Sequence, residues 1–156
     1  MNGLIRLGGI YNGMKILVDA DACPVKQIII RLAKERGIPV TMLVDTSHEL
    51  DDGYSTVITV DKQADSVDFA LINMLSKDDI VVTQDFGLAT MVLGKSARAL
   101  NQNGLVFTSA NIDRLLMERH IGKAIRKNGG RTKGPGKRTK EDDERFEAAF
   151  VKLLEE

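Results

Sequence analysis

From Met14 onward, nearly continuous apolar runs alternate with segments in which apolar residues recur at helical spacing. Short, nearly continuous apolar runs are typical of strands that are buried on both faces of a parallel sheet. These runs lie at 15–19, 40–44, 56–60 and 80–83. Between and after them, apolar residues recur at helical spacing, which predicts helices between Pro24 and Gly37 and over 65–75 and 88–93. This alternation predicts an α/β fold with three layers and a central, mostly parallel sheet.

The pattern changes after residue 96. Two short apolar segments, 97–100 and 105–107, flank Asn-Gln-Asn-Gly and predict a hairpin or a tight turn. A helix over 111–127 then leads into the glycine-rich segment 128–138, and Thr-Lys-Glu-Asp from Thr139 is typical of a capping box. The helix that starts there, over 140–155, carries an apolar stripe and is expected to dock on the domain.

The length of 156 residues fits one domain, expected over 14–156, after a poorly ordered or upstream extension at 1–13. A single Cys excludes a disulfide framework and, with no export signal, indicates the cytoplasm. No apolar run approaches the ~20 residues that span a bilayer, so we expect no membrane partner. The sequence leaves a homo-oligomer open.

The net charge of zero hides a strong asymmetry. Residues 1–118 have 11 basic and 15 acidic side chains, 119–140 have nine basic and none acidic, and 141–156 have two basic and seven acidic. The segment 119–140, here called the basic arm, either binds the phosphates of a nucleic acid or is a solvated surface segment. The candidate phosphate-binding residues are Arg126, Arg131, Lys133, Lys137 and Arg138, together with Lys26 on the first turn of the first helix.

Acidic residues follow three of the predicted strands. Asp19 and Asp21 end the first, Asp65 and Asp68 open the helix after the third, and Asp85 follows the fourth. Ligands of such sheets bind at the carboxyl ends of the strands, where the strand order reverses. Carboxylates gathered there would repel one another, and Mg²⁺ or Mn²⁺ would relieve that repulsion. The alternative for each residue is a cap on backbone amides.

Three blocks of the sequence resemble the signatures of a known bacterial family. The blocks are DADACPVK at 19–26, ADSVD at 64–68 and IVVTQDFGLA at 80–89, and they resemble the uncharacterised YaiI/YqxD family, also called UPF0178 or DUF188. Its C-terminal signature is matched by Arg126, Gly134, Pro135, Asp143, Arg145 and Phe146, so the resemblance runs from Met14 nearly to the end. The glycine-rich loop departs from the family, with Gly-Pro-Gly-Lys where Gly-Gly-Pro is usual.

That family is in turn similar to PIN-like nuclease domains. In those domains an Asp ends the first strand, a helix supplies an acidic residue and Thr-x-Asp ends the fourth strand. Asp19, Asp68 and the pair Thr83 and Asp85 match this pattern. The resemblance implies that the three carboxylates hold Mg²⁺ or Mn²⁺ and that Thr83 orients Asp85 or a water.

Asp21 and Asp65 would be additional carboxylates of the same site. Many PIN domains carry a further acidic residue downstream of Thr-x-Asp. Between Asp85 and the basic arm this chain offers only Asp113 and Glu118.

The hypothesis is a metal-dependent phosphodiesterase or nuclease that acts on RNA. One alternative is a non-catalytic nucleic-acid-binding module that retains the carboxylates. Another is a phosphatase of the haloacid-dehalogenase type, since Asp19-Ala-Asp21 resembles its first motif, but no pair of acids follows a strand after Lys95. Cys23 precedes Pro24 at a helix start, and we expect it to be structural because neighbouring carboxylates oppose thiolate formation.

Overall fold

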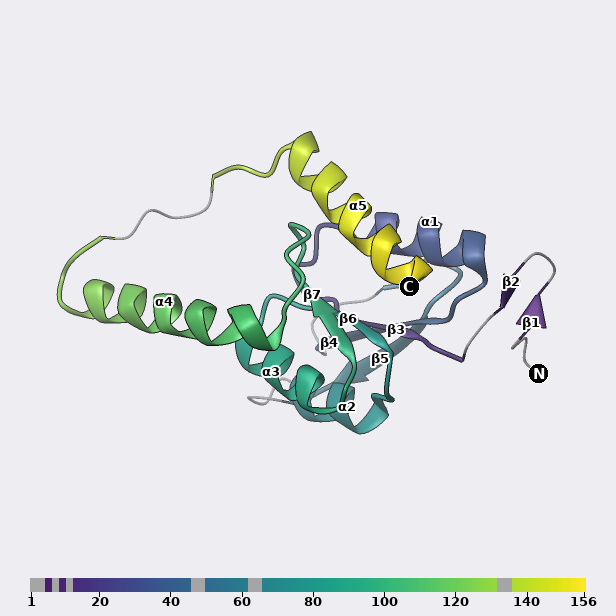
Figure 1. Ribbon diagram of the computed structural model, residues 1–156, viewed down its shortest axis with the longest axis horizontal. Helices are drawn as coiled ribbons and strands as arrows, with labels where there is room; N and C mark the ends of the chain where they lie inside the picture. The colour runs from purple at the N-terminus through teal and green to yellow at the C-terminus, as the bar shows by residue number, and fades with distance from the viewer. Residues whose placement is uncertain (1–4, 7–8, 11–12, 46–49, 62–65, 132–135) are drawn as a thin grey trace.

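The computed structural model describes residues 5–6, 9–10, 13–45, 50–61, 66–131 and 136–156. It contains a five-stranded sheet with helices on both faces (Figure 1). The sheet strands are β3 (Ile16–Asp19), β4 (Val40–Asp45), β5 (Thr56–Val60), β6 (Ile80–Val82) and β7 (Arg98–Leu100). The helices are α1 (Lys26–Arg36), α2 (Ser66–Met74), α3 (Phe86–Gly94), α4 (Ser109–Lys127) and α5 (Lys140–Glu155).

All neighbouring strands of the sheet are parallel, in the order β5-β4-β3-β6-β7. Ile16 of β3 is level with Val40 of β4 on one side and with Ile80 of β6 on the other. The first strand of the sheet is thus its centre, and the strand order reverses between β3 and β6. The predicted fold class, a three-layer α/β domain with a parallel sheet, is confirmed.

Each face of the sheet has its own core. Ile16 and Val18 point to the face that α1 and α5 cover, whereas Leu17 points to the face that α2, α3 and the start of α4 cover. This opposite placement follows from the period of two along a strand. Both faces of β3 are buried, so its residues before Asp19 are apolar throughout. This explains the continuous apolar run from which the strand was predicted.

The C-terminal helix docks as the sequence predicts. Thr139 accepts a hydrogen bond from the Asp142 backbone, and the Asp142 side chain accepts one from the Thr139 backbone, so the capping box is formed. Phe146 and Phe150 are fully buried and stack with ring centroids 5.3 Å apart. The acidic C-terminal segment is therefore part of the core between the sheet and helices α1 and α5.

The predicted hairpin or tight turn is present as a tight turn at Asn101–Gly104. Leu100 and Val106 form a single antiparallel bridge across it, and Oδ1 of Asn101 accepts hydrogen bonds from the backbones of Asn103 and Leu105. Within the N-terminal extension, β1 (Ile5–Arg6) pairs with β2 (Gly9–Ile10) as a short antiparallel ladder that the sequence did not predict.

Helix α4 extends away from the domain. It packs on α3 through its first half, where Ile112 is buried, and its second half projects beyond the sheet (Figure 1). Three aliphatic side chains of that half, Met117, Ile121 and Ile125, are exposed. Among the helices within the described ranges, none is both long and apolar enough to cross a membrane.

Candidate functional site

Three of the five predicted acidic residues, Asp19, Asp21 and Asp85, lie at the carboxyl ends of β3 and β6. Asp19 is the last residue of β3, and Asp85 stands at the N-cap of α3, just beyond β6. From these ends the chain turns to opposite sides of the sheet, through α1 to β4 and through α3 to β7. Such a divergence leaves a crevice at the strand ends.

Thr83 connects the two carboxylates. Its side chain, on a residue that is 2% exposed, donates a hydrogen bond of 3.0 Å to Oδ2 of Asp19. The same Oγ1 accepts a 3.0 Å hydrogen bond from the backbone N–H of Asp85. Oδ1 of Asp85 accepts a 3.1 Å hydrogen bond from Leu88 and so caps α3. Asp85 is therefore both a helix cap and a neighbour of Asp19, and one carboxylate serves both roles.

The electrostatics of the site centre on Asp19. Burial raises the pKa of the Asp19 carboxyl above its ordinary value, and the negative charges of Asp85 and Asp21 raise it further. The hydrogen bond from Thr83 acts in the opposite direction on that pKa. The site thus holds like charges in a partly desolvated place, an arrangement that a bound cation would stabilise.

Asp19, Asp21 and Thr83 line a small cleft of about 40 Å³, and Asp85 lies beside this cleft rather than in its lining. Its lining includes Asp19, Asp21, Cys23, Thr83, Gln84 and Gln102. Oδ2 of Asp21 accepts a 3.0 Å hydrogen bond from the backbone of Asp45, which fixes the carboxylate at the end of β4. We call this place the acidic cleft.

Two glutamines of the acidic cleft were missed by the sequence interpretation. Oε1 of Gln84 accepts a 2.9 Å hydrogen bond from the backbone of Gln102, so the 101–104 turn is held against the end of β6. Gln84 lies between Thr83 and Asp85, and that position was the signal that could have identified it. Gln102 had no such signal, because only the fold brings its turn to the cleft.

Cationic groups from three separate segments contact residues that lie in the acidic cleft or next to its residues in the sequence. Nζ of Lys26 donates a 3.3 Å hydrogen bond to the carbonyl of Ala20, between Asp19 and Asp21 in the sequence. The Arg119 guanidinium lies 6.0 Å from the ring centroid of Phe86, the residue after Asp85. Lys26 thus lies at the end of β3, whereas Arg119 contacts the first residue of α3.

Arg138 is the third cation, and it is also structural. It donates to Asp143 of α5 at 2.7 Å, to Oδ1 of Asn103 at 2.8 Å and to the carbonyl of Gln102 at 2.8 Å. Its charge reaches the cleft, because it lowers the pKa of the Cys23 thiol. The predicted phosphate contact at Arg138 thus lies on a side chain that also joins the 101–104 turn to the C-terminal helix.

The remaining predicted residues lie farther out or outside the described ranges. Asp68 is in the first turn of α2, half-buried, and does not line the acidic cleft. Arg126, Arg131 and Lys137 are exposed on the basic arm. Asp65 and Lys133 lie outside the described residues.

Cys23 lies in the wall of the acidic cleft without the character of a nucleophile. Burial raises the pKa of its thiol, a hydrogen bond with the Val25 backbone and the charge of Lys26 lower it, and Asp19 raises it again. The net direction is upward, so the thiol stays protonated near neutral pH. This agrees with the structural role expected for Cys23.

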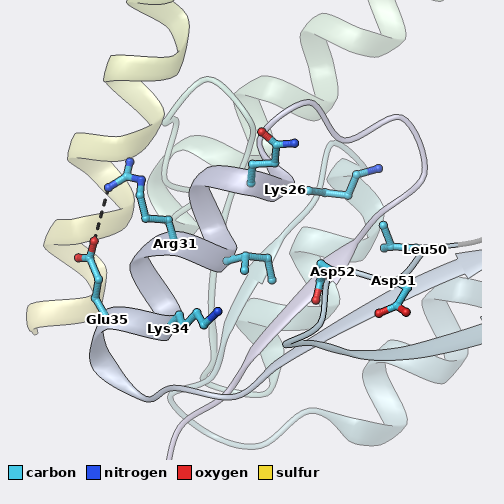
Figure 2. Close-up of a pocket in the computed structure, with 9 residues that line it drawn as sticks. Lys26, Arg31, Lys34, Glu35, Leu50, Asp51 and Asp52 are labelled. Atoms are coloured by element: carbon cyan, nitrogen blue, oxygen red, sulfur yellow. Dashed lines mark ion pairs between the residues drawn. The ribbon is translucent and has the colours of Figure 1, made fainter.

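A much larger cavity, of about 780 Å³, lies between α1 and the segment 50–52. Figure 2 shows its lining, in which Arg31 reaches toward Glu35 at 3.8 Å. Its charged side chains balance, since Lys26, Arg31, Lys34 and Glu35 come from α1 and Asp51 and Asp52 from the other wall. Because these charges balance, the smaller acidic cleft is the better candidate for a cation site.

The donor set of the acidic cleft suits a hard divalent cation. Asp19, Asp21 and Asp85 offer carboxylate oxygens, and Thr83 adds a hydroxyl, which are ligands that Mg²⁺ and Mn²⁺ prefer. Burial and the neighbouring charges of Asp85 and Asp21 both raise the pKa of the Asp19 carboxyl, and a cation would offset both effects. Within the described part of the chain, no three Asp, Glu, His or Cys side chains are placed close enough to hold an ion as they stand. The metal stays a prediction.

The fold and the site define a class, a parallel α/β domain with an acidic cleft at the reversal of its strand order. The chain belongs to the family described as "Uncharacterized BCR, YaiI/YqxD family", whose model matches residues 17–156. It is 65% identical to a UPF0178 protein of Ruminiclostridium cellulolyticum over 90% of this chain and 92% of that protein. It is 50% identical to one of Exiguobacterium sibiricum over 92% and 98%. The family suggested by the three sequence blocks is confirmed.

Among solved structures, the chain is similar to Rae1 (YacP) from Bacillus subtilis, crystallised as a tryptophan-to-leucine mutant. The match has a TM-score of 0.42 and 16% sequence identity, and covers 74% of this chain and 84% of that one.

Proposed function

We propose that this protein is a metal-dependent phosphodiesterase that cleaves RNA at the acidic cleft. The observation that supports the proposal is the charge arrangement around the strand ends. Burial and the charges of Asp85 and Asp21 raise the pKa of Asp19, and Lys26 and Arg138 bind the carbonyls of Ala20 and Gln102 at the cleft. An acidic centre within a cationic rim suits a polyanion that is held by its flanking phosphates and cleaved at the centre.

The resemblance to PIN-like nuclease domains assigns the roles. Asp19 and Asp85 would hold Mg²⁺ or Mn²⁺, with Asp21 as an additional carboxylate and Asp68 and Asp65 as further candidates from the predicted pattern. When bound, such a cation supplies Lewis-acid chemistry at a phosphoryl oxygen and lowers the pKa of water. Thr83 positions Asp19 through its hydroxyl and Asp85 through the backbone, so it keeps both carboxylates aimed at one place.

The basic arm supplies the binding energy. Arg119, Lys123 and Arg126 are spaced along one side of α4, and Arg119 lies over the ring of Phe86, the residue that follows Asp85. A single strand laid along this face would meet cations at successive helical turns. The scarcity of aromatic side chains, 4% of the chain, favours backbone contacts over base stacking.

The test is turnover of single-stranded RNA by the full chain, with Mn²⁺ and with EDTA. We expect cleavage that EDTA abolishes and that Asp19→Asn and Asp85→Asn each lower by at least about 100-fold. Asp61→Asn is the matched control, since Asp61 follows β5 at the same edge of the sheet but is exposed and does not line the cleft. RNA binding without turnover would assign the non-catalytic module instead.

The arm has a separate test. Replacing Arg119, Lys123 and Arg126 together by Gln should weaken RNA binding and flatten the plot of log affinity against log salt concentration. Each lost phosphate contact should reduce that slope by about 0.7. Arg138 is left intact, because its loss would also release the 101–104 turn. An unchanged slope would show that these side chains do not bind phosphates and that the basic arm is a solvated surface segment.

A further inference from the structure

Helix α4 has two opposite faces in its projecting half. Ile112 is buried and Leu115 and Leu116 are half-buried on the side that packs against the domain. At about 100° per residue, that side continues along the helix as Arg119, Lys123 and Arg126. The opposite side carries Met117, Ile121 and Ile125. Arg119, Lys123 and Arg126 and the aliphatic residues of α4 therefore lie on opposite sides of the helix.

The aliphatic side is open to solvent. Met117 is 58% exposed, Ile121 51% and Ile125 42%. Their spacing of four residues puts them in one row over successive turns, which we call the α4 stripe. A row of this kind on a helix that leaves its own domain is typical of a contact surface rather than of scattered surface hydrophobics.

We propose that the α4 stripe pairs with the α4 stripe of a second copy of this chain, antiparallel and centred on Ile121. In that arrangement Ile121 meets its own equivalent at the two-fold axis, and Met117 meets Ile125 of the second copy. A two-fold interface requires one patch that is complementary to itself. The stripe meets this requirement because its outer members are equally far from its centre.

The charges beside the α4 stripe favour a second copy of this chain as its binding partner, and they favour antiparallel over parallel pairing of the two helices. Asp113 and Lys127 are both exposed, on the same flank of the stripe, eight residues before and six after Ile121. Antiparallel pairing sets Asp113 within about 3 Å, along the axis, of Lys127 of the second copy. Parallel pairing would instead set the basic ends of both helices side by side.

The dimer does not depend on the proposed nuclease activity, because the stripe lies opposite the basic side of α4. Three side chains per copy bury less than the roughly 1,200 Å² of a standard stable interface. We therefore expect reversible association that depends on protein concentration.

The first test is sedimentation equilibrium of the full chain from low micromolar to several hundred micromolar. The wild type should pass from monomer to dimer, and Ile121→Asp should weaken the association at least tenfold. Phe69→Asp is the matched control, because Phe69 is 65% exposed on α2, away from the stripe, and the wild-type dimer should persist. A wild-type monomer throughout, or an Ile121→Asp protein that dimerises normally, would overturn the proposal.

The second test fixes the register by disulfide cross-linking. The only Cys of the chain, Cys23, is buried, so an introduced Cys reports its own surroundings. Ile121→Cys should form a covalent dimer on mild oxidation. Ile125→Cys should not, since its two copies would be about 12 Å apart along the axis, beyond the reach of a disulfide. Equal cross-linking of both variants would contradict antiparallel pairing, and no cross-linking of either would contradict the pairing itself.

Discussion

The two ends of the neighbouring strands β3 and β6 have opposite charge arrangements: an ion pair lies at the amino end and neighbouring carboxylates lie at the carboxyl end. At the amino end, Nζ of Lys15 lies 2.6 Å from Oδ2 of Asp79, a side chain that is 1% exposed. The Asp79 carboxylate also accepts hydrogen bonds from the backbones of Lys15 and Ser76, at 3.0 and 2.8 Å. At the carboxyl end of the same strands, burial raises the pKa of Asp19, and the negative charges of Asp85 and Asp21 raise it further.

The comparison separates a carboxylate whose contacts favour folding, Asp79, from one whose surroundings oppose it, Asp19. Asp79 is more deeply buried than Asp19, and every contact described for it stabilises the charged form. Asp19 has one hydrogen bond from Thr83 to offset desolvation and repulsion. A charge arrangement that opposes folding is kept where it serves binding or chemistry, whereas the opposite end of the sheet is arranged for stability.

The largest effect should come from the amino end. Asp79→Asn removes the charge that Lys15 pairs with and turns an NH₂ group toward donors, so the free energy of unfolding should fall by about 3 kcal/mol. Denaturant unfolding would measure the loss. Asp78→Asn is the control, because Asp78 is exposed and Asn tolerates its positive φ of 71°. Equal stability of the two variants would show that the buried pair contributes nothing.

The carboxyl end should respond with the opposite sign. Asp19→Asn keeps an oxygen for Thr83 and removes the repelled charge, so the free energy of unfolding at pH 7 should rise by about 0.5–1 kcal/mol in EDTA, a modest value because partial exposure screens the charges.

The pH dependence of this gain tests its origin. Because its pKa is raised in the folded state, Asp19 lowers stability as the pH rises above about 4, while Asp19→Asn does not. The difference between the two proteins should therefore shrink as the pH falls toward 4. A gain that is independent of pH would exclude charge repulsion as its cause.

The smallest effect should come from Asp85. Asn caps helices about as well as Asp, so Asp85→Asn should preserve the cap on Leu88 and change the free energy of unfolding in EDTA by less than about 0.5 kcal/mol. The same substitution should remove most of the thermal stabilisation that Mn²⁺ gives the wild type. A clear loss of stability in EDTA, with the response to Mn²⁺ unchanged, would make Asp85 a structural cap alone.

The fold was predictable because its strands and helices have different periods. The continuous apolar run at 15–19 identified the central strand, and the Thr139 capping box identified the start of α5. The meeting of Asp19 and Asp85 followed from one rule about strand ends, once the first and fourth strands were taken as neighbours.

The cationic rim was less predictable, because it depends on contacts between segments that are distant in sequence. Nothing local in the sequence shows that Arg138 reaches the turn at Gln102, 36 residues away. The same turn also passes close to α5, since a Cβ on Gly104 would lie 2.5 Å from the carbonyl oxygen of Arg145. Side chains that act through such tertiary contacts have no periodic signal in the sequence. The charge distribution therefore identified the basic arm but did not predict which residues its side chains contact.

The central claim is that the acidic cleft binds a divalent cation, and calorimetric titration with Mn²⁺ tests it most directly. The account predicts saturable binding to the wild type that is lost in Asp19→Asn, strongly weakened in Asp85→Asn and unchanged in the control Asp61→Asn. Binding of equal strength in the wild type and Asp19→Asn, or no saturable binding at millimolar Mn²⁺, would contradict it.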